Sequence, residues 1–151
     1  MILPALAFAA ALQGLPSGDP ARLGRDLQLD YIAANVPAHK DFERFLERDI
    51  IAYFISRGVK QPSIKIDLLR PNATQSGLSN PKYYLWVLVS SSGVQKSSGA
   101  LRVEAIEKAR FNVTDFIPRE EVSSEPDRLS AVFPAALIRE IMERSGAVDH
   151  R

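Results

Sequence analysis

The segment from Lys82 to Val89 constrains the fold most strongly, because it reads as a β-strand with large apolar side chains on both faces. Alternation along a strand turns successive side chains to opposite sides, here Tyr83, Leu85, Val87 and Val89 against Tyr84, Trp86 and Leu88. Leaving either set in water would forfeit roughly 1.5 to 3 kcal/mol per large side chain. We therefore expect an internal strand of a sheet that is covered on both faces.

The composition of the chain limits both its size class and its partners. Its 151 residues, 46% hydrophobic and 25% charged, suffice for one domain with a substantial core but not comfortably for two. The 19 basic and 18 acidic side chains leave a net charge of +1, so no electrostatic feature predicts nucleic acid as a partner. The absence of cysteine excludes a disulfide framework, a thiolate metal site and a cysteine nucleophile. We expect no cofactor.

The N-terminal segment differs in composition from the rest of the chain. Met1 to Gly18 carries no charged side chain, and Ile2 to Leu12 is almost wholly apolar. The apolar run is shorter than the ~20 residues of a membrane-spanning helix and is typical of a secretory signal peptide. We therefore predict a secreted or periplasmic protein with no membrane span in the mature chain. The alternative is an apolar N-terminal helix packed on the domain of a cytoplasmic protein.

The remaining sequence predicts an arm followed by a single α+β domain at residues 40–146, with a short tail at 147–151. Short polar linkers between strands favour antiparallel hairpins. The fold class is therefore a three- or four-stranded antiparallel meander packed against an N-terminal amphipathic helix and a C-terminal helix. Periodicity and turn residues place its parts in this order: a helical or irregular arm (19–39), an amphipathic helix (40–57), a strand (63–68), a loop (71–81), the central strand, a serine-rich turn (90–99), a long alternating stretch (101–117) and a final helix (134–146).

No recognised catalytic or metal-binding motif occurs in the sequence. His39 comes just before the first domain helix, and we interpret it as an exposed cap or loop residue because no partner groups converge on it. The acidic residues of that helix alternate with basic ones opposite its apolar side, as on a solvated helix face: Asp41, Glu43, Glu47 and Asp49. We therefore predict no catalytic residue and no metal site, and an enzyme is the less favoured class.

Two carboxylates interrupt the apolar pattern of the long stretch from Leu101 to Ile117: Glu107 in its middle and Asp115 near its end. Unbroken alternation would place Glu107 on the same face as Val103 and Phe111. An unpaired carboxylate in a core is costly, so the group would be paired or would lie at the mouth of a pocket. A β-bulge near Ile106 would instead turn Glu107 outward. We favour the bulge and keep the pocket carboxylate as the alternative.

The polar face of the same stretch is expected to adjoin the aromatic residues of the central strand. Arg102 and Arg110 would then lie near Tyr84 and Trp86, and aromatic residues beside arginines suit a protein partner, a dimer interface or an organic ligand. The alternative is that the N-terminal arm or a helix covers the aromatic residues, while the arginines keep the flank soluble. These four residues and Glu107 are the predicted binding residues.

A helix against a curved antiparallel sheet resembles the cystatin-like and nuclear-transport-factor-like folds in its layout. Gln95 and Gly99 have the spacing of the glutamine and glycine in the inhibitory loop of cystatins, although Ser97 replaces the usual central valine. Such folds host both binding modules and enzymes, so the layout does not decide the activity. We therefore expect a non-catalytic exported or cell-envelope domain that binds a protein partner or itself through the sheet face. The alternative is a ligand-binding or enzymatic domain whose pocket, between sheet and helix, contains Glu107.

Overall fold

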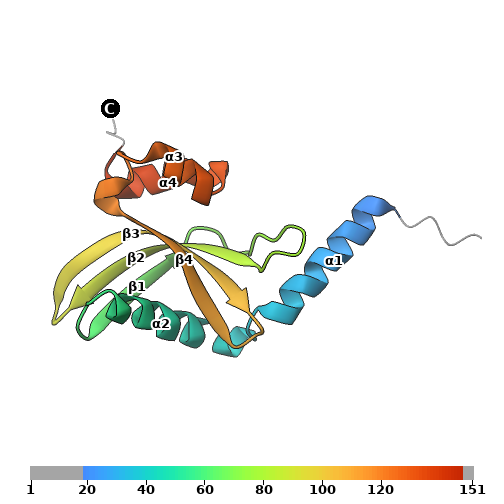
Figure 1. The fold of residues 1–151 in the computed structure, drawn as a ribbon, viewed down its shortest axis with the longest axis horizontal. Helices are drawn as coiled ribbons and strands as arrows, with labels where there is room; N and C mark the ends of the chain where they lie inside the picture. The colour runs from blue at the N-terminus through green and yellow to red at the C-terminus, as the bar shows by residue number, and fades with distance from the viewer. Residues whose placement is uncertain (1–18, 148–151) are drawn as a thin grey trace, which may run out of the picture.

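The structure, a computed structural model, describes residues 19–147, which form a sheet between two helical layers with one further helix projecting from it (Figure 1). The α+β class and the antiparallel meander are as predicted. The elements in chain order are α1 (Pro20–Asn35), α2 (His39–Ser56), β1 (Pro62–Leu68), β2 (Lys82–Ser91), β3 (Val94–Ile106), β4 (Arg110–Pro118), the short 3₁₀ helix η1 (Arg119–Glu121), α3 (Pro126–Val132) and α4 (Ala135–Ser145).

The sheet has four strands in the order β1-β2-β3-β4, and each pairs antiparallel with its neighbour in sequence. β2 is internal, and its side chains enter two separate apolar clusters. Tyr83, Leu85, Val87 and Val89 belong to one cluster, and Tyr84 and Trp86 to the other. The predicted strand with both faces covered is therefore confirmed.

One helical layer comes from α2 and the other from α3 and α4. Helix α2 packs on the first face through Leu46, Ile50 and Phe54, three or four residues apart on one side of the helix. It ends before Gly58, whose φ of 91° suits a helix terminus. The second face is covered by side chains of the last two helices and their connection: Leu129, Phe133, Leu137 and Ile141.

The first long hairpin turns within the predicted serine-rich stretch, but its turn is much shorter than expected. The serine-rich stretch is mostly strand, because β2 and β3 are joined by only Ser92 and Gly93, at φ 52° and 75°. Positive φ at both positions is the requirement of a tight type I′ hairpin turn. The cystatin-like positions Gln95 and Gly99 therefore lie within β3, not in a loop. Gly99 is needed there because a Cβ would collide with the carbonyl oxygen of Ile117.

The stretch predicted as one long strand is also a hairpin. It divides into β3 and β4 at a turn in which Glu107 and Lys108 have φ of 51° and 58°. A bulge does occur, but further along: Arg102 pairs with Asp115 and Val103 with Val113, which leaves Thr114 as the extra residue. The bulge shifts the alternation, so Ile117 joins the second cluster, whereas unbroken alternation from Leu101 would have placed it in the first.

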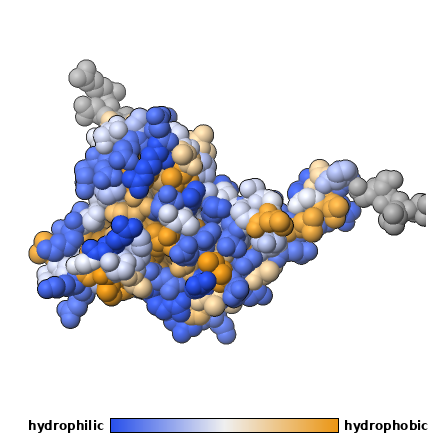
Figure 2. Space-filling model, in the orientation of Figure 1, coloured by the Kyte–Doolittle hydropathy of each residue, from blue (hydrophilic) through white to orange (hydrophobic). Residues whose placement is uncertain are grey.

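Helix α1 projects from the rest of the structure (Figure 1) and has no buried residue. The segment predicted as a helical or irregular arm is thus helical. Leu23, Leu27 and Leu29 are 60%, 60% and 63% exposed, and hydrophobic surface is visible on the projecting helix in Figure 2. The predicted signal peptide at residues 1–18 lies outside the described residues. Among the helices of residues 19–147, none has the length and apolar character needed to cross a membrane.

Candidate functional site

The aromatic residues predicted to border an accessible surface lie beneath the C-terminal helices. Tyr84 and Trp86 are only 5% and 6% exposed, and both pack in the cluster under α3 and α4. The Tyr84 ring lies 5.8 Å from that of Phe133, and its hydroxyl shares a hydrogen bond of 2.7 Å with Thr74 Oγ1. The prediction that Tyr84 and Trp86 border an accessible surface is therefore wrong. The alternative prediction, that a helix covers these residues, is confirmed.

Arg102 lies next to Tyr84 in the sheet register, as predicted, but its guanidinium is engaged within the fold. It forms an ion pair of 2.6 Å with Asp115, and its Nε donates to Thr114 Oγ1 at 2.9 Å. A third bond, of 3.3 Å, reaches the carbonyl oxygen of Val132 in α3. Arg102 thus ties β3, β4 and α3 together.

Glu107 and Arg110 lie at the exposed β3–β4 turn, away from Tyr84 and Trp86. The backbone of the turn is held by Asn35 of α1, whose Oδ1 accepts from Glu107 N–H at 3.1 Å and whose carbonyl accepts from Lys108 N–H at 2.8 Å. Glu107 therefore points outward because of a turn and not because of the predicted bulge. The alternative prediction, that Glu107 is a carboxylate in a pocket between sheet and helix, is therefore wrong.

The outer edge of β4 is occupied by side chains at both ends. Near its start, Asp49 accepts from Phe111 N–H at 2.7 Å, and Arg48 donates to the carbonyl of Ala109 at 2.8 Å. Near its end, Arg128 donates to the carbonyl of Phe116 at 3.0 Å. The bulge at Thr114 disturbs the edge between these points. Such devices hinder the addition of another strand.

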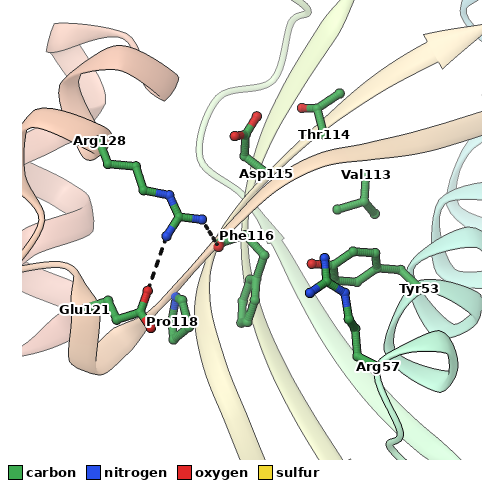
Figure 3. A pocket seen from close by; sticks show the side chains of 9 residues that line it. All are labelled: Tyr53, Arg57, Val113, Thr114, Asp115, Phe116, Pro118, Glu121 and Arg128. Carbon is green, nitrogen blue, oxygen red and sulfur yellow. Dashed lines mark hydrogen bonds and ion pairs between the residues drawn. The ribbon is translucent and has the colours of Figure 1, made fainter.

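A hollow of about 330 Å³ lies beside the β4 edge, between the end of α2 and the start of the C-terminal helices (Figure 3). Most of its charges are matched: Arg128 pairs with Glu121 at 3.3 Å and with Glu125 at 3.0 Å, and the bond to Glu125 raises the pKa of Arg128. The Arg57 guanidinium lies 4.9 Å from the centre of the Tyr53 ring. The charged side chains of this hollow are therefore mostly engaged within the fold.

Within the part of the chain that the structure describes, the outer edge of β1 has no comparable protection. Leu69 N–H donates to the carbonyl of Tyr84, and hydrogen-bonding positions alternate along an antiparallel pair. The backbone groups of Ile64, Ile66 and Leu68 therefore point outward. Within residues 19–147, no hydrogen bond from a side chain or from another segment reaches these groups. A seven-residue strand is thus left with an open edge.

A second hollow, of about 590 Å³, runs along this open edge. Ile64 and Ile66 are half-buried, Leu68 is 42% exposed, and together they form its apolar part. Glu43 and Glu47 of α2 line one side of it. On the other side Arg144 of α4 pairs with Asp67 at 3.1 Å. The hollow therefore combines unpaired backbone, apolar side chains and carboxylates.

The described residues offer little of the chemistry expected of an active site. Over residues 19–147 no group of three or more metal-ligating side chains comes together. Burial raises the pKa of Tyr83, which lies in the core beneath α2. The hydrogen bond to Asp49 raises the pKa of Arg48 at the β4 edge. These shifts occur at packing and edge-closing positions, not beside the hollow at β1.

Sequence reasoning missed the β1 edge, although part of its signal was legible. Glu43 and Glu47 were recognised as exposed, as they are, but nothing in the sequence showed which neighbour this side of α2 faces. Asp49, grouped with them, instead bonds the β4 backbone. The predicted meander already places this first strand at an edge, but whether its outer backbone groups have partners becomes visible only in the assembled fold.

No protein-family model, curated protein or solved structure matches the chain. Its function is therefore inferred from its own geometry.

Proposed function

We propose that the chain is a non-catalytic binding domain that takes up an extended segment of a protein partner along the β1 edge. The observation that carries this proposal is the open outer edge of β1, with its hollow of about 590 Å³. An extended segment laid against Ile64, Ile66 and Leu68 would satisfy their outward backbone groups. Main-chain bonds then supply affinity, and contacts with alternate side chains supply specificity.

The location of the site revises the expectation that binding involves the sheet face. Both faces of β2 are filled, one by α2 and the other by α3 and α4. The two outer edges of the sheet are the other positions where a partner could bind, and side chains block the outer edge of β4. Helix α2 lies beside the open edge of β1 and forms one wall of the groove along that edge. A groove between an edge strand and a helix is a recurring way to bind extended peptides.

A random peptide library displayed on phage, selected against the full chain, tests this proposal. Selected peptides should bind a Leu68→Ala variant only moderately more weakly than the wild-type protein, because alanine keeps the outward N–H and removes only part of the apolar contact. A Leu68→Pro variant should bind about tenfold more weakly or not at all, since proline lacks the outward N–H. Proline is tolerated at strand edges where the N–H faces solvent, so the fold should persist.

Matched substitutions keep the result interpretable. Circular dichroism and thermal unfolding of both Leu68 variants check that the fold is retained. If Leu68→Pro unfolds the chain, Ile66→Pro compared with Ile66→Ala provides the same test one pair further along the strand. The proposal fails if no peptide is enriched above an unrelated protein, or if the proline variants bind as well as their alanine counterparts.

The proposal includes export to the periplasm or the exterior. It is supported by the charge-free composition of Met1 to Gly18 and the apolar run within it. Fusing residues 1–40 to alkaline phosphatase should give activity, because that enzyme matures only after export. A Phe8→Asp change in the apolar run should abolish the activity. Equal activity of both fusions would contradict export by this segment.

A further inference from the structure

The side of α2 that faces the β1 edge carries two carboxylates that form no ion pair with any other described residue. Glu43 and Glu47 are four residues apart on one flank of the helix and are exposed. Among the ion pairs of residues 19–147, none involves either of them, whereas Asp41 pairs with Arg44 at 2.6 Å on the same helix. Both line the same hollow as Ile64 and Ile66. The wall of the groove is therefore negatively charged.

The spacing of these carboxylates suits an extended chain. Four residues of an α-helix advance by about 6 Å. Side chains on one face of a β-strand recur every two residues, which is about 6.6 Å. A strand added to β1 would thus place successive side chains of one face opposite Glu43 and then Glu47. The aliphatic stem of a lysine or arginine can lie over Ile64 and Ile66 while its charge reaches the carboxylates.

The opposite side of the edge strand does not offer the same charge. Arg144 pairs with Asp67 at 3.1 Å and with Glu140 at 3.0 Å, so its charge is matched within the fold. Lys65 is exposed on this side of β1. A bound segment would therefore meet negative charge only with the side chains that point toward α2. A bound segment that matches the groove would therefore carry its basic side chains at alternate positions.

A second copy of the chain is a poorer occupant of the edge than a basic segment. Two β1 strands paired antiparallel about a two-fold axis would place both α2 helices on the same side of the joined sheet. Glu43 and Glu47 would then face their own counterparts. Like charges across such an interface are destabilising.

Building on the proposed function, we infer that the β1 edge is selective for extended protein segments with lysine or arginine at alternate positions. Glu43 and Glu47 bind the basic side chains, and the open backbone of β1 binds the main chain. The residues between the basic ones point to the other face of the sheet, where Lys65 disfavours further positive charge.

Fluorescence anisotropy of the full chain with labelled synthetic peptides tests the inference. The probe is an acetylated, amidated peptide in which lysine and valine alternate, and the comparison peptide has glutamate in place of lysine. The lysine peptide should bind at least about tenfold more tightly. A Glu43→Gln, Glu47→Gln variant should lose most of this preference, and higher salt should reduce it. The control Glu120→Gln, an exposed change in η1, should leave binding unchanged.

The outcomes separate this inference from the proposed function. If both peptides bind equally and Leu68→Pro prevents binding, the edge site stands and the charge selectivity is overturned. Unchanged affinity in the double glutamine variant also overturns the selectivity. If neither these peptides nor the library yields a ligand, the edge site itself falls. If sedimentation shows a dimer that Leu68→Pro dissolves, the occupant is a second copy and the inference is overturned.

Discussion

The two edges of the sheet are treated in opposite ways. At β4, Asp49, Arg48 and Arg128 bond to the outer backbone, and a bulge distorts the strand between them. At β1, the outward groups of Ile64, Ile66 and Leu68 have no such partner within residues 19–147. Both edges belong to the same meander, so topology alone does not account for the difference. The difference comes from side chains of α2 and α3 that bond to the outer backbone of β4.

An open edge exposes a protein to unwanted strand pairing, and natural sheets generally block their edges. In this fold three side chains close β4, while the strand at the other edge is left open beside a groove. The contrast supports a role for β1 in binding, because the same helix that closes one edge lines the hollow at the other.

The largest effect is expected from a residue that belongs to neither edge. Trp86→Ala should lower the free energy of unfolding by about 3 to 5 kcal/mol, because it empties a buried site under α3 and α4. Urea unfolding measures this. The control Leu78→Ala, at a position 86% exposed, should change stability little. A Trp86→Ala variant as stable as the wild-type protein would mean that this face of the sheet is not covered by α3 and α4.

Opening the β4 edge should have the next largest effect. Asp49→Ala leaves Phe111 N–H without its acceptor and removes the partner of Arg48, at a cost of about 1 to 3 kcal/mol. Asp41→Ala removes an exposed ion pair on the same helix and should cost less than about 1 kcal/mol. Chemical denaturation of both variants compares them. Equal losses would show that Asp49 does not protect the edge.

A smaller loss is expected at the other end of β4. Arg128→Gln removes the bond to the Phe116 carbonyl together with exposed ion pairs, and should cost about 1 kcal/mol or less. The matched variant Arg139→Gln breaks an exposed pair within α4 that does not touch β4. Thermal unfolding of both would show whether the contact with the strand matters. A larger loss for Arg139→Gln would contradict the assignment.

The smallest effect is expected in a measurement on the wild-type protein, the hydrogen exchange of its edge amides. In the unliganded protein, the amide hydrogens of Ile64 and Ile66 should exchange with solvent far faster than those of Lys65 and Asp67, which bond to β2. Phe111 N–H, although at an edge, should be slow because Asp49 holds it. Hydrogen exchange followed by NMR resolves these amides. Equal protection along β1 would mean that its edge is already covered.

Much of the fold was readable from the sequence because it depends on side-chain periodicity. The alternation of Lys82 to Val89 and the helical spacing in α2 each specify an element and the face it buries. The β3–β4 turn was missed for a physical reason. Its positive φ angles fall on Glu107 and Lys108, which are not the residues usual in such turns.

The candidate site was less predictable because it depends on neighbours distant in sequence. Tyr84 and Trp86 carry no mark that distinguishes a core position from an interface, and only the packing of α3 and α4 decides between them. The β4 bulge depends on how β3 and β4 meet, and it moved Ile117 to the other face. The open edge is defined by missing partners, which no local pattern encodes.

The attachment of α1 has a geometric consequence. The helix is fastened at its C-terminal end, where Asn35 holds the β3–β4 turn, and near its middle, where Gln28 Nε2 donates to the carbonyl of Gln75 at 2.8 Å. Its 16 residues, with a rise of about 1.5 Å each, span about 24 Å. The helix therefore holds its first residue, Pro20, about that distance from the turn that anchors its other end.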